Sequence, residues 1–129
     1  MKALNVLLWI AQIVLGAMFL MAGYMKLATP LDQLIEQMAW VADVGSFTRV
    51  IGSFELLGAI GLILPAALKI QPKLTGIAAI GLATIMLSAM VFHISRGETS
   101  IIGVNIILGL VAGFIAWGRL KKAPIQAKS

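Results

Sequence analysis

The stretch FTRVIGSFELLGAIGLILPAAL, residues 47–68, is apolar over a length that can cross a bilayer, yet it carries the carboxylate of Glu55 in its interior. A membrane-spanning helix needs about 20 predominantly apolar residues. A charged side chain within a bilayer is costly unless it is paired or neutralised, so such residues are usually functional. The stretch therefore predicts a transmembrane helix with a candidate functional residue inside it.

Three other stretches of the chain have the same apolar character. Hydrophobic residues make up 60% of the 129 residues and charged residues 12%, whereas soluble domains contain about 45–50% apolar and about 25% charged residues. The last two connections between the stretches are short, which makes neighbouring helices antiparallel. The sequence predicts one all-α domain, an integral-membrane four-helix bundle with up-down topology and spans at residues 5–26, 47–68, 74–94 and 101–118.

The first of these stretches also has the position of a signal peptide. One lysine precedes it, its apolar run is too long for the core of a signal peptide, and no clear pair of small residues marks a cleavage site after it. We therefore expect a retained helix.

The segment between the first two spans is predicted to form a short amphipathic helix at residues 30–43. Pro30 suits the first position of a helix, and Leu31, Leu34, Ile35 and Met38 then recur at helical spacing, with acidic and amide side chains on the other faces. Such a helix can be a simple interfacial connector or a lid over a binding site, and the sequence leaves both interpretations open.

Basic residues are distributed unevenly between the two sides of the membrane. The termini and the second loop share one side, which holds Lys2, Lys69, Lys73, Arg119, Lys121, Lys122 and Lys128; the other side holds Lys26, Arg49 and Arg96. By the positive-inside rule, both termini are expected in the cytoplasm, as in a multi-pass protein of a bacterial-type inner membrane. The net charge of +5 thus indicates topology, and contact of a basic tail at residues 119–129 with anionic lipid headgroups, rather than nucleic-acid binding.

The chain has no cysteine and one histidine. This composition excludes disulfide exchange, cysteine-ligated iron–sulfur clusters and a bis-histidine haem from what the chain can do alone. We expect no covalent cofactor and no metal site.

Each span carries one stripe of small and polar residues at helical spacing. Lipid gives helices no hydrophobic reason to associate, so their contacts favour small residues and polar bonds. We therefore expect these stripes to face the bundle interior. They are Gln12, Gly16, Phe19, Gly23 and Lys26; Thr48, Gly52, Glu55, Ala59 and Leu62; Ala79, Ala83, Met86, Met90 and His93; and Asn105, Gly109, Ala112 and Ala116.

Polar residues from all four spans are expected at one level, toward the outer side of the membrane. The candidates for a ligand-binding site are Tyr24, Lys26, Arg49, Glu55, His93 and Asn105. Glu55 lies about 10 Å into its span at 1.5 Å per residue, and we expect Lys26 or Arg49 to supply a compensating charge. The set suits a proton-handling or hydrogen-bonding pocket for an apolar molecule with polar oxygens, such as a quinone.

Each candidate also has a purely structural explanation. Glu55 can belong to a structural ion pair, His93 can cap the end of its helix, and Asn105 can join helices by hydrogen bonds. Arg49 can reach toward Glu55 or extend to the outer headgroups. Their convergence at one level favours a functional role.

Several of these residues together resemble the DoxX-like family of small four-span membrane proteins, over nearly the whole chain. The resemblance rests on Gly23-Tyr24-Met25-Lys26, Arg49-x-x-Gly52-x-x-Glu55-Leu56, Pro65, His93, Asn105 and Arg119. Founding members are named as a subunit of a thiosulfate:quinone oxidoreductase, and other relatives are associated with membrane redox and sulfur-stress complexes. The resemblance implies a redox-associated subunit with a membrane or peripheral oxidoreductase as partner. It does not imply thiosulfate chemistry, because no residue here is an evident thiosulfate catalyst.

Two other functions remain open, and whether the chain is itself an enzyme is open too. One is a structural or assembly protein whose polar cluster fixes helix register. The other is a small proton-coupled transporter, although small multidrug exporters carry their glutamate in the first span, where this chain offers Gln12. Gly109-x-x-x-Gly113 can serve a homo-oligomer, but packing within the chain is the preferred interpretation.

Overall fold

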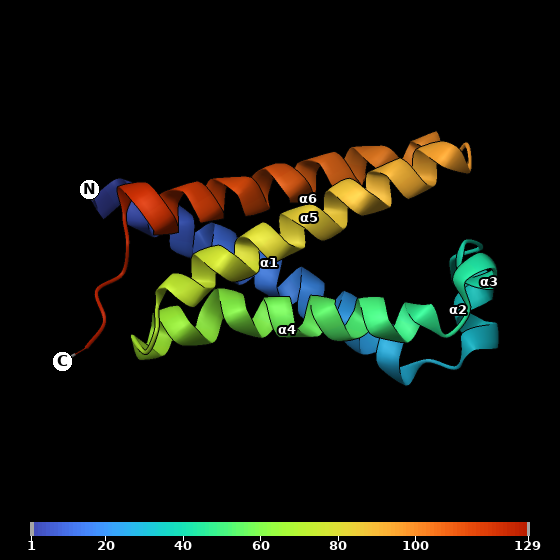
Figure 1. Ribbon diagram of the computed structural model, residues 1–129, viewed down its shortest axis with the longest axis horizontal. Coiled ribbons are helices and arrows are strands. Elements are labelled where there is room, and N and C mark those ends of the chain that lie inside the picture. Colours follow the sequence, from blue (N-terminus) through green and yellow to red (C-terminus); the bar gives the residue numbers. More distant parts are fainter. Residues whose placement is uncertain (1, 129) are drawn as a thin grey trace.

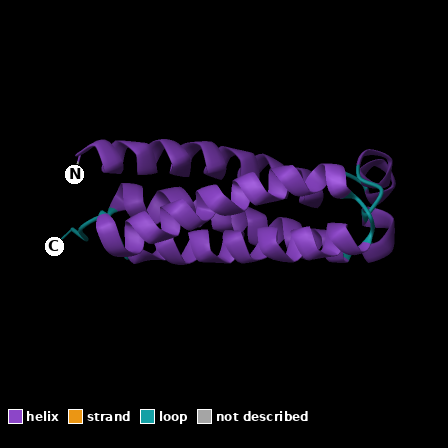
Figure 2. Cartoon of the chain, turned by 90° about the horizontal axis from the view of Figure 1, so that it is seen from above, coloured by secondary structure: helices purple, strands orange, loops and turns teal. Residues whose placement is uncertain are grey.

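The computed structural model describes residues 2–128 and consists of helices joined by short loops (Figures 1 and 2). The four long helices are α1 (Lys2–Ala28), α4 (Phe47–Leu68), α5 (Lys73–Ser95) and α6 (Thr99–Trp117). All four are long and apolar enough to cross a membrane, the last one together with the π-helical turn η1 (Gly118–Lys122). The predicted all-α, integral-membrane four-helix bundle is confirmed.

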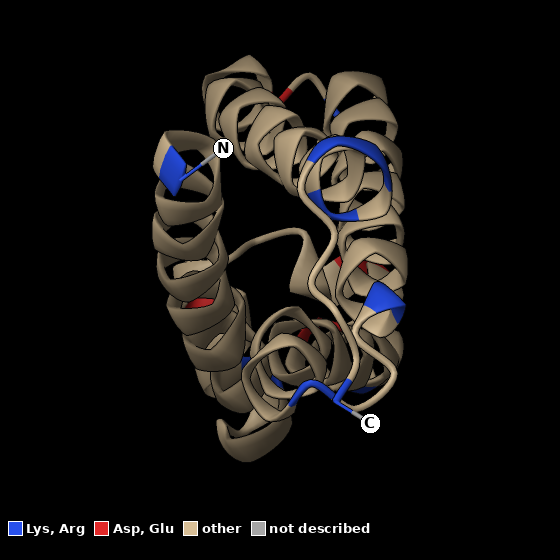
Figure 3. Cartoon of the chain, turned by 90° about the vertical axis from the view of Figure 1, so that its left-hand side faces the viewer, with Lys and Arg blue, Asp and Glu red and all other residues tan. Residues whose placement is uncertain are grey.

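The two ends of the bundle differ. Two short helices, α2 (Leu31–Gln37) and α3 (Val41–Val44), lie at one end, which we call the α2–α3 end. Both termini lie at the opposite end, the terminal end (Figure 1). Viewed from the terminal end, lysine and arginine residues gather near the viewer (Figure 3). The uneven distribution of charge predicted for the two sides is therefore present in the fold.

Two tight turns make the last three long helices antiparallel. Lys69 ends α4 in the left-handed conformation, with φ at 57°, and its N–H donates to the carbonyl of Pro65. Gly97, with φ at 75°, lies between α5 and α6, where glycine adopts a positive φ without steric cost. Both turns reverse the chain within a few residues.

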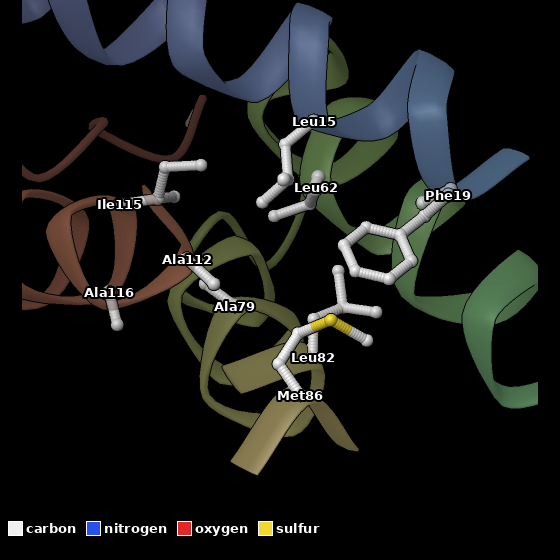
Figure 4. Close-up of a cluster of buried hydrophobic side chains, with 10 residues drawn as sticks. Leu15, Phe19, Leu62, Ala79, Leu82, Met86, Ala112, Ile115 and Ala116 are labelled. Carbon is white, nitrogen blue, oxygen red and sulfur yellow. The ribbon is translucent and has the colours of Figure 1, made fainter. Parts of the chain in front are cut away.

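The long helices associate as two pairs, α1 with α4 and α5 with α6, and α4 joins the pairs by packing on α5. The inward stripes predicted for the first two spans are buried throughout. On α5 and α6 the stripe residues are buried or half-buried. A cluster of apolar side chains from all four helices fills the centre (Figure 4): Leu15, Phe19, Ala59, Leu62, Ala79, Leu82, Met86, Ala112, Ile115 and Ala116.

The segment predicted as one helix at residues 30–43 is instead two helices, α2 and α3. The helix breaks at Met38, whose φ of −136° and ψ of 94° are extended. On one continuous helix Trp40 would lie about 120° around the axis from Leu34, which is buried. The break lets both residues face the bundle, where the Trp40 ring contacts Phe92 and His93 at centroid distances of 6.1 and 5.9 Å.

Arg119, predicted to begin a surface tail, is in fact 2% exposed. Its Nε donates to Gln12 Oε1 at 2.6 Å, and its Nη1 donates to Asn5 Oδ1 at 2.8 Å. Gln12 Nε2 in turn donates to the carbonyl of Leu62 at 2.7 Å. Because α1 supplies neutral acceptors for the guanidinium, η1 can carry this charge into the bundle. The network ties α6 to α1 and α4 at the terminal end.

Candidate functional site

Glu55, on α4, lies inside the bundle and pairs with Lys26 near the end of α1. Lys26 Nζ is 2.8 Å from Glu55 Oε1, and the two residues are 8% and 3% exposed. The approach lies outside hydrogen-bond geometry, so Oε1 accepts no hydrogen bond from any described residue. The opposite charge compensates the buried carboxylate. Of the two cations considered from the sequence, Lys26 is therefore the partner.

The position of this ion pair follows from a glycine contact between α1 and α4. A Cβ added to Gly23 would lie 2.7 Å from the carbonyl oxygen of Gly52, and a Cβ added to Gly52 would lie 2.7 Å from Lys26 Cβ. Small residues let helix backbones approach this closely in a membrane. Each charged residue lies three positions after its contacting glycine and therefore on the same helical face.

Arg49 does not reach the interior near Glu55. Its Nη1 donates to the carbonyls of Lys26 and Thr29, at 2.6 and 2.7 Å. These carbonyls belong to the last turn of α1 and its exit, where helical carbonyls lack intrahelical partners. Arg49 thus holds the end of α1 against the start of α4. Tyr24 is 67% exposed and faces away from the bundle.

His93, near the end of α5, is buried at 6% exposure among polar and aromatic partners. Its Nδ1 lies 3.0 Å from Glu98 Oε1, just beyond the turn at Gly97. The edges of Trp40 and Phe92 contact the imidazole ring. A carboxylate at Nδ1 fixes the ring orientation and favours the tautomer with hydrogen on Nδ1, which leaves Nε2 as the free ring nitrogen.

Asn105, one turn and a half into α6, is 8% exposed. Its amide nitrogen Nδ2 is buried and donates no hydrogen bond to any residue between 2 and 128. Leaving a buried donor unpaired costs about 1–3 kcal/mol. The interhelical hydrogen bond considered for this residue is absent from the described part of the chain, so helix packing does not account for the amide.

Lys26, Glu55, His93 and Asn105 all line one cavity of about 560 Å³. It lies in the half of the bundle nearer the α2–α3 end, and each long helix contributes to its wall. Most of its lining is apolar, with Thr84 and Ser88 as the remaining polar side chains. Four of the six candidates are thus brought together, whereas Tyr24 and Arg49 do not line this cavity.

The helices α2 and α3 lie across the end of the cavity, where Met38, Trp40 and Val44 form part of its wall. We call residues 31–44, which comprise the two helices and the residues between them, the α2–α3 cover. An ion pair between Asp43 of the cover and Arg96 links it to the turn between α5 and α6. This position suits a lid over a cavity, and a simple connector between α1 and α4 would occupy the same place.

The turn after α5 carries a small charge network around Glu98. Arg96 Nε donates to Glu98 Oε1 at 2.7 Å, the same oxygen that faces His93. Hydrogen bonds with His93 and, secondly, with Arg96 hold the pKa of the Glu98 carboxyl below its ordinary value of 4.5. Glu98 therefore remains ionised at neutral pH and presents a fixed negative charge to the imidazole.

A family model described as the DoxX-like family matches residues 10–115. The chain belongs to the DoxX-like family. The match covers all six polar residues of the cavity named above, from Lys26 to Asn105, and confirms the resemblance inferred from the sequence. No curated protein and no solved structure matches the chain.

Several residues around the site of this DoxX-like protein were not among the candidates predicted from the sequence. Glu98 could have been predicted, because it follows His93 by five residues across a glycine turn. The contact of Trp40 with His93 and the Asp43–Arg96 ion pair could not be predicted, because both depend on how the α2–α3 cover folds back onto α5. They add an aromatic wall and a tether to the predicted site.

The arrangement combines hydrogen-bond donors, an imidazole ring and apolar walls. Lys26 and Asn105 offer N–H donors to an oxygen acceptor, and His93 contributes its ring to the same wall. Within residues 2–128, no three histidine or carboxylate side chains gather in a group that could hold a metal ion. These side chains are suited to the recognition of a polar group by hydrogen bonds.

Proposed function

We propose that this DoxX-like protein binds a small apolar molecule with an oxygen-bearing polar head, such as a quinone, and serves a membrane redox partner as a subunit. The observation that carries the proposal is the unpaired amide of Asn105 in the wall of a large apolar cavity. A buried donor without a partner is rare in proteins and calls for an explanation such as a missing ligand. A ligand carbonyl oxygen would satisfy it.

The cavity fits a quinone head in size and chemistry. Ligand sites usually occupy about 300–1,000 Å³, with mostly apolar walls and few polar groups. This cavity has about 560 Å³ and aromatic walls that include Trp40, Phe54 and Phe92. Asn105 and Lys26 would hold the ring oxygens, and His93 would supply or accept a proton. When bound, a quinone supplies reversible electron and proton transfer.

The role as a redox subunit rests on the resemblance to the founding members of the family, and no residue of the cavity requires it. The structural alternative explains the Lys26–Glu55 pair, since each charge compensates the other. It leaves the Asn105 amide and the cavity without a purpose. The proton-coupled transporter gains no support from the geometry.

We also propose that the terminal end faces the cytoplasm of a bacterial-type inner membrane. Seven basic residues lie at the terminal end and three at the α2–α3 end, which supports this orientation by the positive-inside rule. The α2–α3 cover would then face the outer side. Reporter fusions at Ser129 and near Glu36 test it, and an exported Ser129 reporter would contradict it.

The ligand is tested by extracting the purified protein with organic solvent and identifying lipid-soluble molecules by mass spectrometry. We expect a quinone-like molecule to accompany the wild type and to be lost from Asn105→Leu, which removes the amide and keeps a similar volume. Ser53→Ala is the matched control, because Ser53 is an exposed α4 residue bonded to the carbonyl of Arg49, outside the cavity wall.

The comparison of the two variants also separates binding from structure. If Asn105 served helix packing, Asn105→Leu would lower the stability of the protein and Ser53→Ala would not. A well-folded Asn105→Leu protein that still carries the same ligand as the wild type would refute the assigned site. Absence of any such molecule from the wild type, together with failure to bind an added quinone, would favour the structural alternative.

A further inference from the structure

The cavity is closed unequally on its different sides. Its inner wall is formed mainly by buried residues of α1, α5 and α6, including Phe19, Met86 and Asn105, and only Met18 and Ile101 of the α1 and α6 lining are exposed, at 45% and 36%. The α2–α3 cover lies across the end. Between α4 and α5, by contrast, the lining residues Val50 and Phe54 are 43% and 59% exposed, and Thr84 and Ser88 are exposed as well. In a membrane, this side faces the bilayer.

A second hollow continues from this side along the α4–α5 interface. It has about 510 Å³, and it shares Phe54, Thr84 and Ile85 with the wall of the cavity. Farther toward the terminal end its lining includes Gly58, Ala78 and Gly81. Figure 1 shows α4 and α5 close together near the terminal end and diverging toward the α2–α3 end. We call this second hollow the α4–α5 groove.

We propose that the molecule bound in the cavity is a tailed membrane lipid that enters sideways from the bilayer, with its polar head at Asn105 and its tail in the α4–α5 groove. The proposal rests on the proposed function and narrows its substrate class from small apolar molecules to amphipathic lipids. It gives the α4–α5 groove the role of binding the tail, whereas the polar residues of the cavity bind the head.

The continuity of the two hollows supports a single elongated ligand. His93 and Ala78 lie fifteen residues apart on α5, so the cavity and the groove together extend about 22 Å along that helix at 1.5 Å per residue. A free lipid tail and a bound one are both surrounded by apolar groups, so a preference for the groove comes from van der Waals packing of the tail against its walls rather than from burial of apolar surface. Small residues such as Gly81 give it the shape that accepts a tail.

The cover supports entry from the membrane rather than from water. The Asp43–Arg96 ion pair and the contact of Trp40 with His93 hold the cover over the end of the cavity. The α4–α5 side has no such cover among residues 2–128, and its exposed lining is apolar at Val50 and Phe54. A lipid can therefore reach the polar residues without displacing α2 and α3.

Gly81→Phe tests the groove with little risk to the fold. A Cβ added to Gly81 meets no atom within 4 Å, so the new ring would extend into the groove rather than into the bundle. Gly113→Phe is the matched control, since Gly113 is an exposed α6 glycine whose added Cβ also meets open space. Gly81→Leu provides a second, smaller obstruction.

The probes are two benzoquinones with identical rings, one with a decyl tail and one with a methyl group in its place. Binding to protein in lipid nanodiscs is followed through quenching of Trp40 fluorescence, in a background that carries Trp9→Phe and Trp117→Phe so that Trp40 is the remaining tryptophan. Probe concentrations are expressed as mole fractions in the lipid, so that partitioning into the bilayer is not counted as binding. In the wild type, we expect the tailed probe to bind about ten-fold more tightly.

In Gly81→Phe and Gly81→Leu, we expect this advantage of the tailed probe to disappear while the methyl probe binds as in the wild type. Gly113→Phe should retain the full advantage. If the tailed probe keeps its advantage in both Gly81 variants, the groove does not hold a tail, although the head site stands. If neither probe binds the wild type, the proposal of a quinone-like ligand is refuted, and the proposal of a tailed lipid is refuted with it.

Discussion

Lys26 Nζ and Glu55 Oε1 lie 2.8 Å apart across the α1–α4 interface, and both residues are buried. Removing one member of a buried ion pair leaves the other charge without compensation. We expect Glu55→Gln and Lys26→Met to lower the free energy of unfolding by about 3 kcal/mol each. The free energy of unfolding of the double variant should fall by much less than the sum of the two single losses. Denaturant titration of all four proteins in mixed micelles measures this coupling.

The close contact of Gly23 with Gly52 gives a second prediction. In Gly23→Ala, the new methyl group would lie 2.7 Å from a backbone oxygen of α4, so the helices must separate. We expect a loss of about 1–3 kcal/mol, as for other overpacked sites. Gly113→Ala, which has open space, should be neutral or stabilising by up to about 1 kcal/mol, because alanine favours helix. Equal effects at the two positions would contradict the contact.

The lowered pKa of Glu98 leads to a prediction of how the stability of the protein depends on pH. Its pKa is lowered by His93 and Arg96, so the folded protein binds a proton at Glu98 less readily than the unfolded chain does. The resulting stabilisation is complete above its ordinary pKa of 4.5 and is lost as the pH falls through the lower folded-state value. Glu98→Gln lacks this contribution at every pH.

The stability difference between wild type and Glu98→Gln is the quantity to measure, from about pH 6 down to about pH 3. The other acidic residues are the same in both proteins, including Asp43 of α3, which pairs with Arg96 at this turn, so their contributions largely cancel in the difference. We expect the difference to shrink toward low pH. A difference that grows as the pH falls would show that Glu98 is not held ionised by His93 and Arg96.

Arg119 provides a prediction for the terminal end. Arg119→Met would leave Gln12 Oε1 and Asn5 Oδ1 without their donor, and we expect a loss of about 2 kcal/mol. Arg119→Lys should recover little, because an ammonium cannot reproduce the fork of the guanidinium. Lys121→Met, an exposed change one turn away or less, serves as the control. Full recovery by lysine would mean that charge alone matters at this site.

The sequence was sufficient to predict which helix faces meet. The spacing of glycines and polar residues placed Glu55, His93 and Asn105 on inward faces, because helical periodicity and the behaviour of small residues in lipid require only local information. The sequence could not show whether Lys26 or Arg49 is the partner of Glu55. That choice depends on the depth at which α1 contacts α4, which the Gly23–Gly52 contact sets.

Long-range contacts account for what the sequence left undetermined. The break in residues 30–43 lets Trp40 reach a ring on another helix, and a periodic pattern carries no sign of such a partner. Arg119 looked like part of a basic tail because its acceptors, Asn5 and Gln12, are more than 100 residues away in the chain. The cavity itself was predicted only as a convergence of polar residues, without its side facing the bilayer.

The division of the long helices into two pairs separates the polar residues of the cavity into two groups. Lys26 and Glu55 belong to α1 and α4, whereas His93 and Asn105 belong to α5 and α6. A change in the angle between the pairs would leave the charged contact intact and alter its distance from the imidazole and the amide. A ligand of the kind proposed, bound to Lys26 on one pair and to Asn105 on the other, would therefore fix the angle between the two helix pairs.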